Sequence, residues 1–183
     1  MVSKPKPGQK VKLISSLFSS DVNLIMKVIK QMEQHFGLSD WISEKIIFDR
    51  TKYYAKEMGW PLYRRFISFE KLIYPEFLVE AKLITNTIED KHLSDMQRNI
   101  NIDPGYISLE RLVLATGKNY THRIYLGKGI YADLTLVFHA GTFKSLEWTY
   151  PDYRNEQTID YFNMVRDNYL SYLRGKKRNR IKG

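Results

Sequence analysis

Cysteine is absent from the 183 residues, which excludes disulfide bonds, thiolate nucleophiles and metal sites built on cysteine, including zinc and iron–sulfur sites. A chain without cysteine fits the reducing cytoplasm. The chain also lacks any run of about 18 apolar residues, the length that a membrane-spanning helix needs. Its N-terminus lacks the apolar core of a signal peptide. We therefore expect a soluble, cytoplasmic protein without a membrane partner.

Metal-binding spacings are missing too. The four histidines are scattered, without the His-x-His, His-x-x-x-His or Glu-x-x-His spacing that brings ligands to one metal: His35, His92, His122 and His139. A zinc or iron site is therefore not predicted. A magnesium or manganese site with oxygen ligands stays open at Asp49, Asp103 or Asp133. No Gly-x-Ser-x-Gly elbow supports a nucleophilic serine.

A phosphate-binding P-loop is absent as well. That loop ends in Gly-Lys-Ser/Thr and opens a helix, so that backbone amides and the lysine surround the phosphates. Gly-Lys occurs at Gly117-Lys118-Asn119 and at Gly127-Lys128-Gly129, but each tripeptide joins two strand-like runs. A P-loop GTPase is therefore not expected, and nucleotide binding would need another geometry.

The positive charge lies at the two ends of the chain. The net charge is +9 at pH 7, and ten cations lie near the termini: Lys4, Lys6, Lys10 and Lys12 at the start, and Arg174, Lys176, Lys177, Arg178, Arg180 and Lys182 at the end. Without these ten, the rest of the chain carries a net charge of −1. Such tails attract phosphates without sequence specificity, or they only aid solubility.

The length of 183 residues predicts one domain. Hydrophobic residues make up 43% of the chain, enough for a core that offsets the conformational entropy of folding. The first residues alternate lysine with proline and glycine, and the last are mostly basic. We expect a disordered basic arm over residues 1–10, a single α+β domain over 11–174 and a basic tail over 175–183.

Residue periodicity in the first half predicts the order β-α-β-β-α. One helix is the clearest, because Ser19, Ser20 and Asp21 supply N-cap oxygens, apolar residues recur at helical spacing and Gly37 ends it. A second helix opens at Pro75, which suits a first helical position. The expected elements are strand Val11–Phe18, helix 21–37, strand Trp41–Phe48, a turn with a short helix over 50–61, strand Tyr63–Phe69 and helix Pro75–His92.

The second half predicts a sheet with short connections. Asp103-Pro104-Gly105 is expected to form a turn, because proline presets φ and glycine accepts a positive φ. Alternating apolar residues in Ile130–Phe138 place one face of that strand on the core. The expected elements are strand Leu109–Thr116, a hairpin of Thr121–Leu126 and Ile130–Phe138, an edge strand Phe143–Trp148, a polar aromatic loop over 150–154 and a helix from Glu156 that stops at Gly175.

These elements predict an α+β fold in a single domain, a mainly antiparallel sheet of about six to seven strands with three main helices. Its start, β-α-β-β-α-β, is ferredoxin-like, and a C-terminal hairpin and a final helix extend it. The alternative is a sheet curled towards a barrel, since the strands after Asn99 are long and consecutive.

Seven sequence blocks resemble one known family when taken in this order: FDRTKYYAKEMG, LYRRFISFEKL, KLITNTIE, NIDPGY, LVLATGK, HRIYLGKGIYADLTL and WTYPDYR. Over nearly all of residues 11–170, the chain is similar to the uncharacterised prokaryotic family called domain of unknown function 4416. The resemblance implies no established activity, although some members are labelled GTP-binding. The family more often has Glu at the position of Asp133, so the carboxylate here has a shorter reach.

His122 and Asp133 are the candidate catalytic residues, because a histidine oriented by a carboxylate is a common general base. If the hairpin turns with Gly127 and Lys128 alone in the loop, His122 lies opposite Asp133, with the two Cβ atoms about 4.5–5.5 Å apart. A loop centred on Lys128 and Gly129 would slide the register by two residues and keep His122 on the same face as Asp133, whereas a three-residue loop would separate the two faces. The alternative role is a cross-strand polar pair that sets the register. In this register Arg123 lies on the opposite face of the hairpin, which it shares with the apolar residues Ile130, Ala132 and Leu134, and its position there has no explanation.

A wider set of polar and aromatic residues is predicted to bind ligand: Asp49, Tyr54, Arg64, Asp103, Tyr106, Lys118, Arg123, Tyr125 and Tyr150. Arginine pairs with phosphate and tyrosine rings stack on bases, so the set predicts a protein that binds or acts on a phosphate-bearing small molecule such as a nucleotide. Two alternatives remain: a structural or protein-interaction domain without catalysis, and an RNA-binding accessory protein that uses its basic tails. Neither enzymatic activity nor oligomeric state follows from the sequence.

Overall fold

The structure is a computed structural model that describes residues 4–48 and 54–181, with side chains described as far as Gly175. Its strands are β1 (Val11–Ser19), β2 (Ser39–Ile42), β3 (Ile46–Phe48), β4 (Leu62–Ile73), β5 (Leu93–Ser94), β6 (Gln97–Arg98), β7 (Asn101–Ile107), β8 (Arg111–Thr116), β9 (Arg123–Gly127), β10 (Ile130–His139) and β11 (Thr142–Ser145). Its helices are α1 (Val22–Phe36), α2 (Ala55–Met58), the 3-10 helix η1 (Pro75–Phe77), α3 (Leu78–Asp90), α4 (Pro151–Arg154) and α5 (Glu156–Ile181).

A single antiparallel sheet joins most of these strands. Seven follow the order β11-β10-β8-β7-β1-β4-β2, while β3 pairs with β4 and β9 pairs with β10. The strands β7-β1-β4-β2 form the predicted ferredoxin-like unit, because each helical crossover skips one strand: the connection from β1 to β2 passes over β4, and the connection from β4 to β7 passes over β1. The predicted α+β class and mainly antiparallel sheet are confirmed. Over the described residues the sheet stays open and does not close into a barrel.

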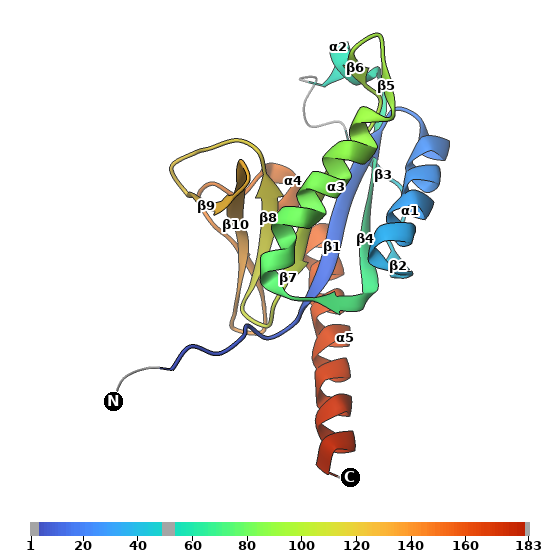
Figure 1. Cartoon of the computed structure of the whole chain (residues 1–183). Helices are drawn as coiled ribbons and strands as arrows, with labels where there is room; N and C mark the ends of the chain where they lie inside the picture. The colour runs from blue at the N-terminus through green and yellow to red at the C-terminus, as the bar shows by residue number, and fades with distance from the viewer. Residues whose placement is uncertain (1–3, 49–53, 182–183) are drawn as a thin grey trace.

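Both faces of the sheet are covered, and β1 at its centre is buried along all nine residues. Alternate residues of a strand point to opposite faces. Leu13 and Leu17 therefore pack in the core beneath α1 and α3, whereas Ile14 packs with Phe162 and Val165 of α5. Figure 1 shows α1 and α3 on one side of the sheet, and α5 continuing well past its end.

Helix α1 forms where the periodicity predicts it. The carboxylate of Asp21 accepts hydrogen bonds from the backbone N–H groups of Asn23 and Leu24, which caps the helix. Gly37, with a φ of 87°, ends it. The buried stripe has helical spacing: Ile25, Val28, Ile29, Met32 and Phe36. Burial of each such side chain contributes about 1.5–3 kcal/mol.

The predicted strand Trp41–Phe48 is wrong as one element, because β2 and β3 pair separately with β4. The break lies at Ser43, whose hydroxyl oxygen accepts a hydrogen bond of 2.9 Å from the backbone N–H of Phe66. The N–H of Ser43 donates in turn to the Phe66 carbonyl. A side-chain oxygen thus takes the place of a backbone acceptor and interrupts the strand.

The predicted turn at Asp103-Pro104-Gly105 is also wrong, because these residues lie inside β7. The whole of β7 pairs with β1, but its pairing with β8 begins only at Gly105. Proline has no N–H to donate, so Pro104 suits the point where the ladder to β8 ends. Gly105 serves a close approach of two strands rather than a turn, since a Cβ there would lie 2.5 Å from the Val113 carbonyl oxygen.

Two predictions fail near the C-terminus. The expected loop over 150–154 contains α4, which starts with Pro151 at a first helical position. The final helix does not stop at Gly175 but continues to Ile181. A glycine inside a helix costs only about 1 kcal/mol relative to alanine, and the lysines and arginines that follow favour helix. Residues 175–181 therefore extend α5.

Several smaller boundaries also differ from the prediction. Strand β4 runs to Ile73, past the expected end at Phe69, and β11 ends at Ser145, before the expected Trp148. The helix expected from Pro75 is η1 followed by α3, and β5 pairs with β6 in an unexpected small hairpin. In the part of the chain that the structure describes, no helix is both long and apolar enough to cross a membrane.

Gly105→Ala should destabilise the protein, because the new methyl group would meet the Val113 carbonyl and, at 2.7 Å, a methyl of Leu114. Forced overpacking of this kind costs about 1–3 kcal/mol, measured as the free energy of unfolding in urea. The matched control is Gly117→Ala, where nothing lies within 4 Å of the added Cβ. We expect the control to change stability by less than about 0.5 kcal/mol; equal effects of the two substitutions would contradict the close packing at Gly105.

Candidate functional site

The β9–β10 hairpin carries the candidate catalytic pair in a register that differs from the predicted one. Asp133 lies opposite Arg123, not opposite His122. The connection turns through three successive residues with positive φ: Gly127, Lys128 and Gly129. The pairing also shifts by one residue just after this turn, which moves β9 by one position relative to a two-residue loop.

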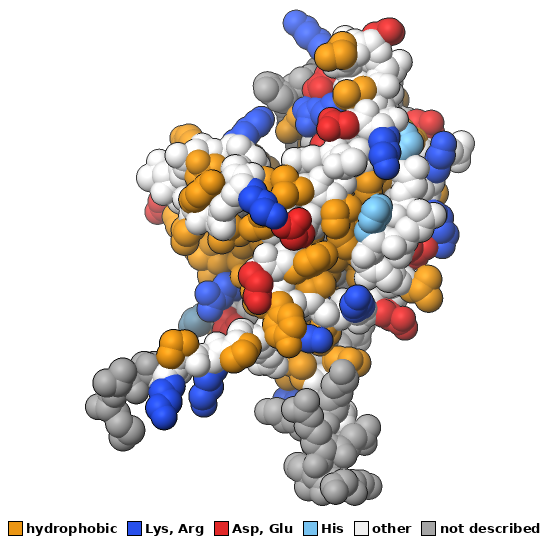
Figure 2. Space-filling model, viewed as in Figure 1, with side chains coloured by type: hydrophobic (Ala, Val, Ile, Leu, Met, Phe, Trp, Pro, Cys, Tyr) orange, Lys and Arg blue, Asp and Glu red, His pale blue; other side chains and the backbone are white. Residues whose placement is uncertain are grey.

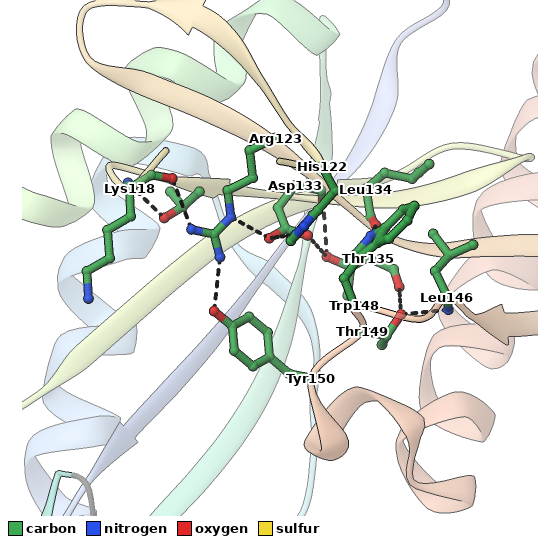
Figure 3. A network of polar contacts seen from close by, with 11 residues as sticks. Lys118, His122, Arg123, Asp133, Leu134, Thr135, Leu146, Trp148, Thr149 and Tyr150 are labelled. Atoms are coloured by element: carbon green, nitrogen blue, oxygen red, sulfur yellow. Dashed lines mark hydrogen bonds and ion pairs between the residues drawn. The ribbon is translucent and has the colours of Figure 1, made fainter. Parts of the chain in front are cut away.

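His122 and Asp133 nevertheless meet, with Nε2 of His122 at 3.2 Å from Oδ2 of Asp133. His122 lies just before β9, so its side chain reaches the carboxylate from outside the paired strand. Nε of Arg123 donates to the same oxygen at 2.9 Å. Figure 3 shows both side chains converging on Asp133. The cross-strand position of Arg123 explains the arginine that the predicted register left among apolar residues.

The guanidinium nitrogens of Arg123 donate hydrogen bonds to other groups of the protein. Nη1 donates to the carbonyl oxygen of Lys118 and Nη2 to the hydroxyl of Tyr150, each at 3.0 Å. Burial opposes its charge, but the bonds and charges of Asp133 and Tyr150 together raise the pKa of Arg123 above its ordinary value. An arginine engaged in this way keeps little hydrogen-bonding capacity for a phosphate.

Aromatic rings enclose His122. Its imidazole stacks on Trp148, with ring centroids 5.0 Å apart and planes 12° from parallel, and meets Tyr120 edge to face. The indole N–H of Trp148 donates to the Leu134 carbonyl at 2.8 Å, and the hydroxyl of Thr149 donates to a neighbouring carbonyl of β10. These bonds fasten the segment between β11 and α4 to β10. A carboxylate-bound imidazole can transfer a proton, but here it is also a packing element.

A second polar group surrounds Arg64 on β4. Its side chain is only 6% exposed, and Oδ2 of Asp152 lies 3.2 Å from Nη1 as an ion pair. The guanidinium carbon also lies between 4.3 and 6.0 Å from the centroids of four aromatic rings: Phe48, Phe18, Phe66 and Tyr153. Cation–π contacts of this kind stabilise a desolvated guanidinium by about 2 kcal/mol. Burial raises the pKa of the Tyr153 hydroxyl, which therefore stays protonated.

Arg64 lines a pocket of about 140 Å³ between β3, β4 and the start of α5. Its Nε and Nη1 are buried and make no hydrogen bond to the described residues, so the ion pair with Asp152 is the polar contact of Nη1 and Nε has none. The pocket also contains three polar residues where α5 begins: Asn155, Gln157 and Thr158. The side-chain oxygen of Asn155 accepts from the N–H of Gln157, which caps α5.

A third polar group lies beside the first part of β7, which does not pair with β8. Lys82 of α3 donates to the Ile102 carbonyl at 2.8 Å, and Glu89 accepts from the N–H of the same residue. These two side chains bond the edge of β7 as a neighbouring strand would. Burial raises the pKa of Glu89 to about 7, against the lowering effect of nearby Lys82. Asp103 lies 3.6 Å from Nζ of Lys82 and accepts from Asn101.

The predicted ligands therefore separate into different places. Lys118, Arg123 and Tyr150 belong to the hairpin network, and Tyr54 packs against two of the rings around Arg64. Two others join none of the three groups: Tyr125 accepts from the N–H of Gly129, and Tyr106 is half-buried against the core, where burial raises its pKa. Asp49 lies outside the described residues. Within the described ranges, no group of three or more His, Asp or Glu side chains is arranged to hold a metal.

Several site residues escaped the sequence prediction. Asp152 pairs with Arg64, and Trp148 stacks on His122. Glu89 accepts a hydrogen bond from the backbone of β7 at Ile102. Each belongs to a different secondary-structure element from its partner, so spacing carries no signal of the contact. The block WTYPDYR, dense in polar and aromatic residues, was the available sign for Asp152 and Trp148.

Asp133→Ala should cost about 3–5 kcal/mol of unfolding free energy, because it leaves the buried charge of Arg123 without its partner. His122→Ala should cost less, about 1–2 kcal/mol, since it removes one hydrogen bond and the stacking on Trp148. Urea denaturation of both variants measures the difference. A His122 variant as unstable as the Asp133 variant would show that Arg123 does not depend on this carboxylate.

The comparisons with known proteins point to one family and to no activity. No curated protein and no solved structure matches the chain. The model of a family described as "Domain of unknown function (DUF4416)" matches residues 9–169, nearly the whole of the chain. This match confirms the resemblance expected from the seven sequence blocks. The chain belongs to the DUF4416 family.

Proposed function

We propose that the protein binds a phosphate-bearing small molecule, such as a nucleotide, in the pocket at Arg64 and without a P-loop. The observation that carries the proposal is the guanidinium itself. It is almost fully buried, it lines a pocket, its Nε has no hydrogen-bond partner in the described part of the chain, and its Nη1 has only the ion pair with Asp152.

Unsatisfied donors explain why an anion would bind there. A buried donor without a partner costs about 1–3 kcal/mol, and more for a charged group. Nε and Nη2 lie on one edge of the guanidinium, so two phosphate oxygens would accept from this fork as the carboxylate of Glu57 does from Arg98. The first turn of α5, at Gln157 and Thr158, lies in the same pocket, and the positive end of a helix dipole favours negative charge.

The size of the pocket limits what enters it. A volume of about 140 Å³ is below the roughly 300–1,000 Å³ of sites that enclose a whole drug-sized ligand. A phosphate group would enter, while the rest of the molecule would lie outside against the exposed side chain of Ile47. Asp152 opposes an added anion, so the phosphate would displace this carboxylate from Arg64 or bind together with a cation such as Mg²⁺.

A structural domain without catalysis is the second candidate, and the hairpin network favours it. The bonds of Arg123 all end on groups of the protein, and His122 is enclosed by rings. This pattern is that of a polar network that fixes the hairpin and the segment after β11. It supports the reading of His122 and Asp133 as a structural pair rather than as an acid and base.

A thermal-shift panel of inorganic phosphate, sugar phosphates and nucleotides, each with and without magnesium, tests the proposal. A ligand at about 100 times its dissociation constant stabilises the folded state by about 2.7 kcal/mol. For a domain of this size the melting temperature would rise by about 5–10 °C. Arg64→Lys keeps the charge but loses the fork, and Ile47→Glu adds a negative charge at the exposed rim. Both should abolish most of the shift.

Arg65→Lys is the matched control, because Arg65 is the next residue of β4 and does not line the pocket. It should keep the full ligand-induced shift. No shift of wild type with any phosphate compound would count against the proposed function. Equal losses in the Arg65 and Arg64 variants would count against this pocket.

A further inference from the structure

Exposed apolar side chains gather at one place on the protein, the β9–β10 hairpin and the segment bonded to it. Six of the fifteen large hydrophobic side chains that are exposed among the described residues lie here, and together they are called the hairpin patch: Tyr120, Ile124, Tyr125, Leu126, Trp148 and Tyr150. Figure 2 shows hydrophobic side chains over this hairpin on the left of the view. A contiguous apolar surface of this kind marks an interaction site on a folded protein.

The members of the hairpin patch touch common neighbours, so they form one surface. Tyr120 meets His122 edge to face, and the imidazole of His122 stacks on Trp148. The hydroxyl of Tyr150 accepts a hydrogen bond from Arg123, the first residue of β9. The other three members are consecutive residues of the same strand. Rings that are already held by such contacts lose little conformational freedom when a partner binds.

The strand β9 is also an open edge of the sheet. In the part of the chain that the structure describes, it pairs with β10 alone. The N–H of Arg123 donates to the Tyr120 carbonyl at 3.0 Å, so the open part begins at Ile124. A register shift at Leu126, next to the turn, leaves Ile124 and Tyr125 in regular pairing with β10. Proteins commonly protect an open edge with lysine or proline, and β9 has neither.

We infer that the hairpin patch joins two copies of this chain, with β9 of one copy antiparallel to β9 of the other. Tyr125 is the middle residue of β9. A twofold axis at this residue places Tyr125 opposite Tyr125 of the second copy, and Ile124 opposite Leu126 of the second copy. The central pairs are therefore all apolar or aromatic. This surface is independent of the pocket at Arg64.

Charge favours a second copy over a different protein. An interface with twofold symmetry brings a surface against itself, so any charge near its axis meets the same charge of the second copy. The six side chains of the hairpin patch carry no charge. Arg123 faces Gly127 of the second copy in this register, and its guanidinium stays bonded within its own copy. Lys128 in the turn pairs with Glu80.

The area of the hairpin patch suits a stable dimer. A fully buried aromatic side chain covers about 150–250 Å². The four rings of the patch are 40–66% exposed, so they offer roughly 300–500 Å² for contact. Together with the exposed parts of Ile124 and Leu126, they supply the greater part of the about 800 Å² that each partner buries in a standard interface.

Analytical ultracentrifugation of the full chain tests the inference. Wild type should sediment at twice the 21.7 kDa of one chain. Ile124→Lys combined with Leu126→Lys sets like charges opposite each other and removes the central apolar contacts, so it should weaken the dimer about 100-fold or more. The control, Leu38→Lys combined with Met96→Lys, adds the same charge at exposed apolar side chains outside the patch and should leave the dimer intact. Circular dichroism melting checks that both variants fold.

Thiol crosslinking tests the register itself. The chain has no cysteine, so a short bis-maleimide reacts only at an introduced thiol. Tyr125→Cys should be joined into a covalent dimer, because directly opposed Cβ atoms lie about 4.5–5.5 Å apart. Leu38→Cys, at an exposed position outside the patch, should stay a single chain. A monomeric wild type, a dimer that the lysines at 124 and 126 leave intact, equal weakening by the control pair, or equal crosslinking of the two cysteine variants would each overturn the inference.

Discussion

The burial of β1 on both faces is the constraint on which the rest of the structure depends. Antiparallel partners on both edges and helices on both faces leave none of its nine residues at the surface. This strand also sets the positions of two polar groups. Phe18 pairs with Arg64 on one side, and Ser16 pairs with Asp103 on the other. Arg64 is therefore held inside the sheet, where its guanidinium can be desolvated by rings without leaving the pocket.

Neighbouring residues in the sequence were enough to predict an element when its capping residues and apolar spacing all indicate the same structure. Helix α1 has a cap at Asp21, a helical apolar stripe and a glycine at its end, and tertiary contacts agree with all three. The same approach failed at Asp103-Pro104-Gly105, because a proline and a glycine serve a turn and a close strand approach equally well. Only the position of Val113 on β8 decides between them. Gly175 failed for a related reason, since one unfavourable residue does not end a long helix.

The candidate site was predicted in part. The contacts that the sequence did not predict join residues from different elements of the fold. The contact of His122 with Asp133 occurs although the register is off by one, since His122 precedes the strand and approaches from the side. Arg64 was among the predicted ligands, but its partner Asp152 is distant in the chain, and unsatisfied donors leave no mark in a sequence. Asp103 was chosen as a turn residue and lies instead beside Lys82. The guanidinium of Arg123 is thus hydrogen-bonded through three nitrogens within the hairpin network, whereas Nε of Arg64 at the pocket has no hydrogen-bond partner among the described residues.

The central claim is that the buried guanidinium of Arg64 receives a phosphate group, and a crystal structure grown with inorganic phosphate measures this directly. The account predicts phosphate oxygens within hydrogen-bonding distance of Nε and Nη2 of Arg64, with the carboxylate of Asp152 moved away or joined to the phosphate by a cation. An intact ion pair of Arg64 with Asp152, with phosphate bound elsewhere or nowhere, would contradict it.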